Sequence, residues 1–277
     1  MLAYINRFFL NRYSSFITLL LLTTLTYTHP LLTQEENKPL FIVLSPPKCG
    51  TFLIGKAIEM ITKKPACYIL TSLYDNENTN QTIKQAQEHG SFVIAHHYQQ
   101  IVIDHLIEQG YKAVFTLRDP RDQLISSLNW VREGQWPWLK VNQLTDYNAQ
   151  LEELITGELF GQRCYEMFMK RQIKTIEKIE KSLVYIAKFE NLVGPNGGGQ
   201  FDLQISELMN LAHFLGYKIS SAEAKEIAEN LFSGTLTFRK GQIGQWEDQF
   251  SGLHRIFYKL LYGKLLINLG YEKDYDW

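Results

Sequence analysis

The sequence has few cysteines and almost no net charge. Its 3 cysteines among 277 residues show no C-x-x-C spacing, and an odd number cannot be completed as intrachain disulfides. This excludes a disulfide scaffold and a Cys-based zinc or redox motif, and we predict no metal site. With 28 basic and 29 acidic residues, the formal net charge is -1, so no overall field draws the chain to nucleic acid. We therefore predict no nucleic-acid partner, and any anion site must be local.

Charge is also absent from one long stretch near the N-terminus. Residues 13–33 contain no Lys, Arg, Asp or Glu, and Arg7 and Arg12 precede the densest apolar run, residues 16–22. The pattern predicts a secretory signal peptide or an uncleaved membrane anchor, with an amphipathic N-terminal extension as the alternative. We expect residues 13–33 to associate with a membrane, and the protein to be membrane-associated or in the secretory pathway. A domain that faces the cytoplasm also fits the pattern.

Composition and length predict one domain after this segment. Hydrophobic residues make up 45% of the sequence and charged residues 21%, as in ordinary globular proteins. The chain contains no internal repeat and no low-complexity tract. We therefore interpret residues 1–37 as the targeting segment and residues 38–277, about 240 residues, as one α/β domain.

Short apolar runs alternate with helical patterns along this domain. The run at residues 40–44 is wholly apolar, which is typical of a strand buried on both faces of a parallel sheet. Similar runs predict strands at 67–70, 92–95, 113–117 and 183–187. Helical spacing predicts helices at 51–61, 84–88, 100–109, 120–132, 161–181, 206–215, 222–231 and 253–267.

The alternation of strands and helices predicts a P-loop-like α/β fold of three layers, with a mainly parallel central sheet and helices on both faces. In such a fold, ligands bind beyond the carboxyl ends of the strands. The glycine-rich segment at 194–199 follows no strand directly, so we interpret it as a flexible surface loop and not as a phosphate cradle.

The turn between the first predicted strand and its helix is a candidate phosphate site. Residues 45–51 read Ser-Pro-Pro-Lys-Cys-Gly-Thr, which places the N–H groups of Gly50 and Thr51 at the positive end of a helix dipole. Lys48 adds a full charge, and the Thr51 hydroxyl can cap the helix and bond a phosphate oxygen. The turn lacks the Gly-Lys-Ser/Thr of ATP- and GTP-binding loops, which argues against nucleoside-triphosphate hydrolysis. A tight turn with a solvated Lys48 is the structural alternative.

This turn resembles the first signature of the sulfotransferases that use 3′-phosphoadenosine 5′-phosphosulfate (PAPS) as sulfuryl donor. Residues 47–51 read Pro-Lys-Cys-Gly-Thr where the family has Pro-Lys-Ser-Gly-Thr. In the family this segment grips the 5′-phosphosulfate, which implies contacts from Lys48, Cys49, Gly50, Thr51 and Phe52. A second segment, 114–127, is similar to the family's strand that ends in Arg and is followed eight residues later by Ser. The resemblance implies that Arg118 and Ser126 hold the 3′-phosphate.

A third segment lies near the C-terminus. Residues 238–250 begin Phe-Arg-Lys-Gly and continue with Gly-x-Trp, and they resemble the family loop that closes over the same 3′-phosphate. The resemblance implies phosphate contacts from Arg239, Lys240 and Gly241. Because three segments agree in order across about 210 residues, we predict a PAPS-dependent sulfotransferase that acts on a hydroxyl or amine.

The chemistry of sulfuryl transfer and the resemblance together indicate two catalytic side chains. Lys48 is placed to neutralise charge on the leaving phosphate. His96 follows a predicted strand where cytosolic members of the family carry Lys-Thr-His, and we predict it to be the base that takes the acceptor's proton. His97 and two glutamates, Glu59 and Glu77, are alternatives for this base.

Several residues depart from the family's pattern. Cys49 replaces a Ser, so one side-chain donor is lost while the backbone donors stay. Ile94 stands in the place of a Lys, Leu53 in that of a Trp that stacks on adenine, and Phe52 in that of a second Thr. Phe189 begins a Phe-Glu-Asn segment similar to the family's Tyr-Glu-Asp, so it can stack on the adenine but cannot donate a hydrogen bond.

The acceptor is not identified by these segments. Trp130, Trp136, Pro137 and Trp138 follow the second segment, and we predict that they line the acceptor site. Aromatic walls suit sugars, steroids and phenols alike, so a small molecule, a glycan and a glycolipid all remain open. Two other functions are also open: a catalytically inactive, membrane-tethered nucleotide-binding protein of the same fold, and a P-loop small-molecule kinase.

Overall fold

A five-stranded parallel sheet with the strand order β2-β3-β1-β4-β5 lies at the centre of the computed structural model. The structure describes residues 41–69, 81, 83–86, 88–96, 107–232 and 241–277. The strands are β1 (Phe41–Leu44), β2 (Ala66–Ile69), β3 (Phe92–Ala95), β4 (Lys112–Leu117) and β5 (Val184–Lys188). Every strand lies within one residue of a predicted apolar run, and the predicted parallel sheet is confirmed.

Strand β1 occupies the middle of the sheet. It pairs with β3 on one side and β4 on the other, so that Val43 lies between Ile94 and Val114. All three side chains are buried. A strand with neighbours on both sides and helices on both faces has no position for a polar residue, which explains its wholly apolar sequence.

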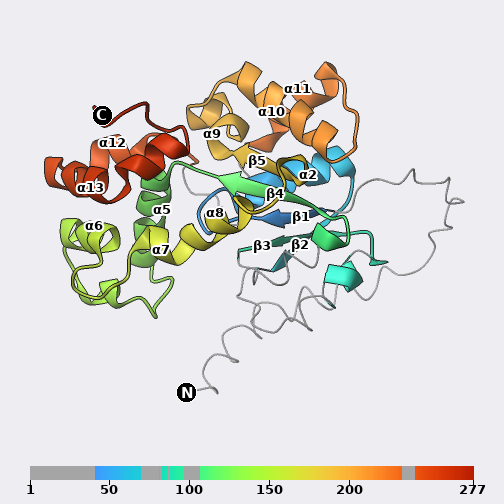
Figure 1. The fold of residues 1–277 in the computed structure, drawn as a ribbon. Coiled ribbons are helices and arrows are strands. Elements are labelled where there is room, and N and C mark those ends of the chain that lie inside the picture. Colours follow the sequence, from blue (N-terminus) through green and yellow to red (C-terminus); the bar gives the residue numbers. More distant parts are fainter. Residues whose placement is uncertain (1–40, 70–80, 82, 87, 97–106, 233–240) are drawn as a thin grey trace, which may run out of the picture. The chain divides into compact units, whose positions relative to one another are not determined.

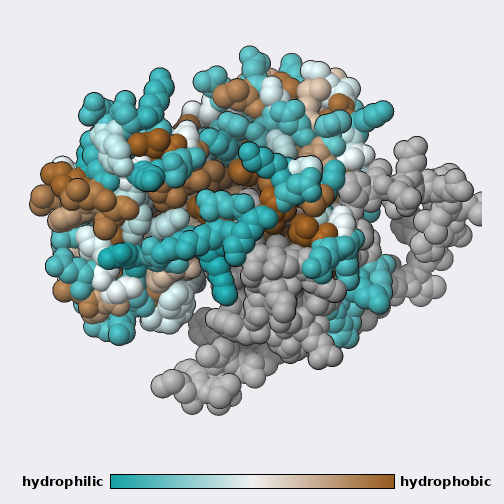
Figure 2. All heavy atoms as spheres, in the orientation of Figure 1, coloured by the Kyte–Doolittle hydropathy of each residue, from teal (hydrophilic) through white to brown (hydrophobic). Residues whose placement is uncertain are grey.

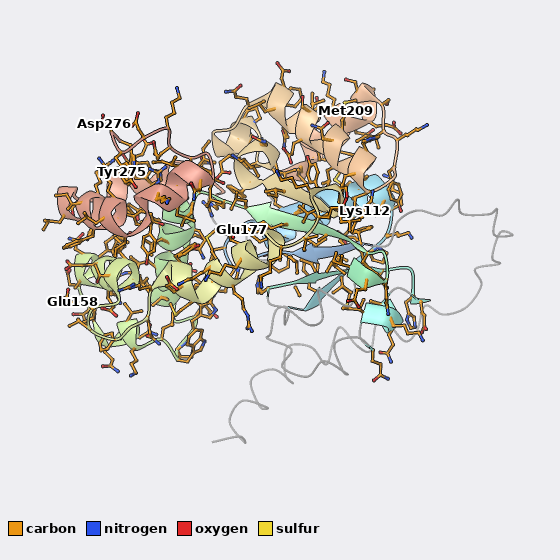
Figure 3. All side chains as sticks on the ribbon, in the orientation of Figure 1. Lys112, Glu158, Glu177, Met209, Tyr275 and Asp276 are labelled. Carbon is orange, nitrogen blue, oxygen red and sulfur yellow. The ribbon has the colours of Figure 1, made fainter. Side chains whose placement is uncertain are left out.

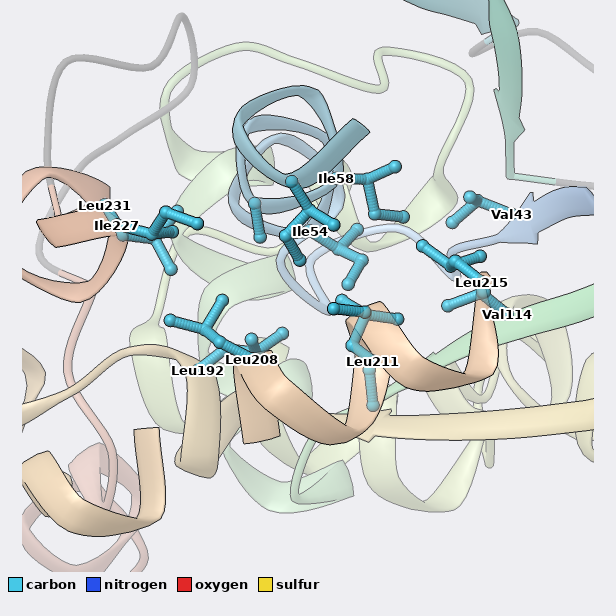
Figure 4. Close-up of a cluster of buried hydrophobic side chains, with 14 of the residues drawn as sticks. Val43, Ile54, Ile58, Val114, Leu192, Leu208, Leu211, Leu215, Ile227 and Leu231 are labelled. Atoms are coloured by element: carbon cyan, nitrogen blue, oxygen red, sulfur yellow. The ribbon is translucent and has the colours of Figure 1, made fainter. Parts of the chain in front are cut away.

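Three helices cover one face of the sheet: α2 (Thr51–Thr62), α10 (Phe201–Phe214) and α11 (Ser221–Leu231). Figure 4 shows their buried side chains, with Ile54 of α2 and Leu211 of α10 in the same cluster as Val43. The end of α10 is tied to the sheet, since the Lys112 ammonium, labelled in Figure 3, donates to the Phe214 carbonyl at 2.9 Å.

The opposite face is covered by α8 (Lys170–Ile176) and by helical residues at 83–86. Met169 and Ile173 belong to the same buried cluster as Ile42 and Leu44 of β1. Helices therefore lie on both faces of the sheet (Figure 1), and the predicted three-layer α/β fold is confirmed.

A second group of helices packs around its own hydrophobic cluster. It contains α5 (Pro120–Arg132), the 3-10 helix η1 (Lys140–Gln143), α6 (Tyr147–Thr156), α7 (Cys164–Phe168), α12 (Gln245–Gln249) and α13 (Gly252–Asn268). In Figure 1 the labelled helices of this group lie to the left of the sheet. Helix α5 begins where predicted because Asp119 caps it, accepting from the Arg121 N–H at 2.8 Å, and Pro120 occupies its first turn.

The predicted helix at 161–181 is wrong as a single element. The chain instead forms α7 and α8 with Met169 between them, followed by the 3-10 helix η2 (Lys181–Leu183). Phe168 packs into the second group of helices, whereas Met169 and Ile173 pack against the sheet. Because neighbouring side chains serve two different clusters, one continuous helix cannot satisfy both.

The glycine-rich segment at 194–199 is not an independent surface loop. It forms the 3-10 helix η3 (Pro195–Gly197) shortly after α9 (Phe189–Leu192). Gly197 is buried, and its carbonyl accepts from the Ile243 N–H at 3.0 Å. Pro195 and Asn196 are exposed, so the turn lies at the surface as predicted, but composition alone does not reveal that another segment packs on it.

The surface in Figure 2 carries an apolar patch over α13, where Leu253, Ile256 and Leu260 are exposed. Within the part of the chain that the structure describes, no helix is both long and apolar enough to cross a bilayer. Residues 13–33, which carry the prediction of a signal peptide or anchor, lie outside the described residues, as does most of the predicted helix at 100–109.

Candidate functional site

The carboxyl ends of four strands lie at one edge of the sheet, and the segments that follow them carry several of the predicted site residues. Ser45 follows β1, His96 follows β3, Arg118 follows β4 and Phe189 follows β5. All four strands run in the same direction, so the residues after them meet at the same edge. Hydrogen bonds join the segments after β3 and β4 directly to the turn after β1.

The turn after β1 has an unusual backbone. Lys48 has a φ of 67° and Gly50 a φ of 90°, both in the left-handed region that favours glycine. A Cβ atom added at Gly50 would lie 2.7 Å from Cδ2 of Phe189, which is closer than such atoms can approach. Glycine is therefore required at position 50 both by its backbone conformation and by the neighbouring ring.

The Thr51 hydroxyl does not cap α2 as predicted. Gly50 is the N-cap residue and Thr51 is the first residue of the helix. The Thr51 hydroxyl instead lies 2.8 Å from the Ser45 hydroxyl, which also accepts from the Thr116 hydroxyl at 2.7 Å. This chain of hydroxyls fixes the start of α2 against β1 and β4. The first N–H groups of a helix have no partner within it, so those of α2 point out of its N-terminal end, which is the arrangement that binds anions in other proteins.

Arg118 joins the first and third predicted segments. Its Nη1 donates to the Lys48 carbonyl at 3.1 Å and its Nη2 to the Gln242 carbonyl at 3.0 Å. The guanidinium carbon lies 4.4 Å from the centroid of the Phe189 ring. The side chain is 5% exposed, and within the described residues its Nε has no hydrogen-bond partner. A buried cation with an unused donor is a suitable site for an anion.

Two carboxylates hold the surroundings of Arg118 in place. Asp122 accepts from the Gly244 N–H at 2.7 Å and from the Trp246 N–H at 3.1 Å, which fastens the third segment to α5. Burial raises the pKa of Asp122, while Arg118 and the two N–H donors act in the opposite direction. Glu190 accepts from the Asp119 N–H at 2.8 Å, which fastens the end of β4 to the segment after β5.

His96 has a fixed orientation. Its Nδ1 lies 2.7 Å from the Ser45 carbonyl oxygen, which can only accept, so Nδ1 carries the hydrogen. In the neutral ring Nε2 then carries the lone pair, which is the form that a general base requires. Burial lowers the pKa of His96; the bond to Ser45 opposes this shift and the charge of Lys48 adds to it. The ring is therefore neutral near pH 7.

Lys48 lies beside one of the predicted acceptor-site aromatics. Its ammonium nitrogen is 3.8 Å from the centroid of the Trp130 ring. Trp136 and Trp138 do not share this position, because they pack with Phe168 at centroid distances of 4.5 and 6.5 Å in the second group of helices. The structure thus separates Trp130 from the tryptophans that the sequence grouped with it.

The remaining predicted contacts differ in position. The side chain of Cys49 is buried in the hydrophobic cluster between the sheet and α8, so only its backbone groups are left to contact a ligand at the turn. Phe52 stacks on Tyr68 at a centroid distance of 4.8 Å. Ser126 lies half-buried on α5, and Gly241 begins the described part of the third segment. Arg239, Lys240 and His97 lie outside the described residues.

Of the two glutamates proposed as alternative bases, the structure describes Glu59 alone. The Glu59 carboxylate accepts from the Ala66 N–H at 2.8 Å, at the beginning of β2 and thus at the opposite edge of the sheet. This position argues against Glu59 as the base. Glu77 lies outside the described residues. Where the structure describes the chain, no group of three His, Cys, Asp or Glu residues could hold a metal ion.

Sequence reasoning missed several residues that support the site. Ser45 and Thr116 form the hydroxyl chain, and Gln123 donates from Nε2 to the Pro47 carbonyl at 3.1 Å. The Tyr271 hydroxyl donates to the second oxygen of Glu190 at 3.1 Å. Ser45 could have been found from its place at the end of an apolar strand. The partners of Gln123 and Tyr271 are distant in sequence and carried no local signal.

A parallel sheet whose central strand β1 leads through a tight turn into α2 defines a P-loop-like α/β protein. Residues 38–270 match the family described as sulfotransferase domain. The chain therefore belongs to the sulfotransferase family, and the predicted family and enzyme class are confirmed. No curated protein matches the sequence significantly.

Solved structures share the fold. The mouse sulfotransferase SULT7A1 complexed with PAP has a TM-score of 0.62 and 17% identity, over 84% of this chain and 86% of that one. Retinol dehydratase with retinol and PAP has a TM-score of 0.56 and 16% identity, over 83% of both chains. Retinol dehydratase with androsterone and the inactive cofactor PAP has a TM-score of 0.55 and 16% identity, over 83% of this chain and 82% of that one. These likenesses show the fold.

The requirement for glycine at position 50 can be tested with two matched variants. Gly90 also has a positive φ, but a Cβ there would meet nothing within 4 Å. We expect Gly90→Ala to lower the free energy of unfolding by about 1–2 kcal/mol, the cost of the left-handed backbone. Gly50→Ala should cost at least about 1 kcal/mol more, because the buried Phe189 ring must move. Urea unfolding measures both; equal losses would show that the Phe189 contact is unimportant.

Proposed function

We propose that this sulfotransferase uses PAPS as its donor and transfers the sulfuryl group to a hydroxyl or an amine. The observation that carries the proposal is the environment of Arg118, which contacts the first and third segments and has a buried Nε–H to which none of the described residues offers an acceptor. A 3′-phosphate is close to a dianion and would accept from this donor. The PAP complexes of proteins with the same fold support this donor.

The other end of the donor fits the turn after β1. The N–H groups of Gly50 and Thr51 stand at the positive end of α2, a helix of 12 residues, and would bind the 5′-phosphosulfate. Lys48 lies in the same turn and adds a full charge. Arg118 donates to the Lys48 carbonyl, so a hydrogen bond joins the residue assigned to the 3′-phosphate directly to one assigned to the 5′-phosphosulfate.

PAPS, when bound, would supply an activated sulfuryl group. We assign to Lys48 the neutralisation of charge that builds up on the 5′-phosphate oxygen as its bond to sulfur breaks. The Trp130 ring, 3.8 Å from the Lys48 ammonium, would hold this charge at the edge of the sheet. In the same position Trp130 would form one wall of the acceptor site.

His96 is the proposed base. The acceptor oxygen or nitrogen would form its bond to sulfur while its proton passes to Nε2 of His96. Two observations support this role: the Ser45 carbonyl orients the ring, and burial keeps it neutral near pH 7. A neutral base next to a cation favours an active enzyme over a protein that only binds the nucleotide.

We keep association with a membrane through residues 13–33 as part of the proposal. Its support is the absence of charge in that stretch. A domain on the cytoplasmic face of the membrane would meet PAPS directly, whereas a domain in the secretory pathway would need PAPS to be delivered there.

Donor binding is tested with PAP, the desulfated donor (adenosine 3′,5′-bisphosphate). We expect PAP to raise the melting temperature of the wild type far more than ATP does. Arg118→Lys should weaken PAP binding by roughly 10- to 100-fold in calorimetry, because a lysine cannot keep both carbonyls and the phosphate. Arg132→Lys is the matched control, since Arg132 lies at the other end of α5 and bonds Gln150. Equal stabilisation by PAP and ATP would contradict the proposed donor.

Turnover is tested by transfer of labelled sulfate from PAPS to a panel of sugars, phenols, steroid alcohols and amines. Lys48→Met should lower the transfer rate by roughly 100- to 1,000-fold, the usual effect of removing one group that stabilises developing negative charge. Lys225→Met, on the exposed side of α11, serves as the control. PAP binding without any transfer by the wild type would instead favour the inactive nucleotide-binding protein.

The role of His96 gives a prediction about pH. Its pKa is lowered from 6.5, and the base must be unprotonated, so kcat/KM for the donor should be constant near pH 7 and fall only in more acidic solution, below pH 6.5. His96→Asn keeps a donor for the Ser45 carbonyl but removes the base, and should lower the rate by roughly 100- to 10,000-fold. This variant should also lack the acidic fall in rate. A variant with an unchanged pH profile would show that another group is the base.

A further inference from the structure

The third predicted segment rests on the glycine-rich turn that contains η3. The Ile243 N–H donates to the Gly197 carbonyl at 3.0 Å, and the Gln242 side chain donates from Nε2 to the Asn196 carbonyl at 2.8 Å. The turn itself is closed by two hydrogen bonds to the Gly194 carbonyl, from the N–H groups of Gly197 at 3.0 Å and Gly199 at 2.8 Å. One closed turn therefore presents two carbonyls to the segment that follows Gly241.

Gly197 is where the two backbones approach most closely. A Cβ atom added there would lie 2.4 Å from the Gly241 carbonyl oxygen and 2.2 Å from Cγ2 of Val193. Gly197 does not have a positive φ, so its backbone conformation suits any residue. Glycine is required at this position by the Gly241 carbonyl on one side and the Val193 side chain on the other, and a methyl group would have to displace both.

The segment that rests on this turn, residues 241–243, also contacts the buried Arg118. The Gln242 carbonyl accepts from Arg118 Nη2 at 3.0 Å, while the neighbouring Ile243 N–H is held by Gly197. The single peptide group between Gln242 and Ile243 thus connects the glycine-rich turn to Arg118. Further along, Asp122 holds the N–H groups of Gly244 and Trp246. A displacement of Gly241 would therefore be passed to the next peptide group along the chain, the one that Arg118 contacts.

We propose that Gly197 is a positioning residue for recognition of the 3′-phosphate of the donor. This inference rests on the proposed use of PAPS. Gly197 touches no part of the donor in this scheme; it fixes the position of the backbone at Gly241 and Gln242, and through the Gln242 carbonyl the position from which Arg118 reaches the phosphate. The glycine-rich turn then determines how strongly the protein distinguishes a nucleotide with a 3′-phosphate from one without it.

The test compares two nucleotides on the full chain. Calorimetry measures the affinity for PAP and for adenosine 5′-monophosphate (AMP), which lacks the 3′-phosphate. Gly197→Ala should weaken PAP binding by roughly 10- to 100-fold, since one or two charged hydrogen bonds would be misplaced, and AMP binding by less than about threefold. Gly252→Ala is the matched control: Gly252 lies at the exposed start of α13, a Cβ there meets nothing within 4 Å, and both affinities should be unchanged.

A second variant covers the case in which Gly197→Ala does not fold. Gln242→Leu removes the side-chain bond to Asn196, on the exposed side of the turn, and should weaken PAP binding by roughly 2- to 10-fold with AMP binding unchanged. Equal losses for PAP and AMP, or no loss in either variant while the wild type prefers PAP, would overturn the inference and leave the proposed donor intact. A wild type that binds PAP no more tightly than AMP would overturn both.

Discussion

Both Nη atoms of Arg118 donate to backbone carbonyls, one in the turn after β1 and one in the segment before α12. A buried charge is costly unless it is compensated, and two carbonyl oxygens with one aromatic face compensate it only in part. Within the described residues no carboxylate forms an ion pair with Arg118. An incoming anion would complete the environment of this guanidinium, so the folded protein itself favours a negatively charged ligand at this point.

The carboxylates near Arg118 are occupied by other partners. Asp119 accepts from the backbone of Arg121 and pairs with its guanidinium, Asp122 binds two backbone N–H groups, and Glu190 binds the backbone of Asp119 and the Tyr271 hydroxyl. Asp122 and Glu190 each fasten one segment of the site to another, and Asp119 holds the first turn of α5. Asp122 and Glu190 still attract the charge of Arg118, but within the described residues neither carboxylate forms an ion pair with its guanidinium.

Local sequence predicted the sheet closely because a strand buried on both faces leaves no choice of side chain, as in β1. It predicted the start of α5 because Asp119 and Pro120 act within one turn. The meeting of Arg118, His96 and the turn at Lys48 followed from parallel strands ending at one edge. Contacts between distant segments could not be predicted: the break between α7 and α8 depends on two clusters, Trp136 packs on Phe168, and Gly197 is restricted by a carbonyl 44 residues later in the printed sequence.

The thiol of Cys49 lies directly behind the turn that carries Lys48. It is buried, and burial raises its pKa, so it stays protonated and unreactive while the turn is closed. A thiol in this place becomes accessible only when the backbone between Ser45 and Thr51 opens. Alkylation of Cys49 would therefore count opening events of the turn, and a ligand that holds the turn shut would slow the modification in proportion to its occupancy. Cys49, which stands where the signature it resembles has a Ser, thus reports how often the turn opens.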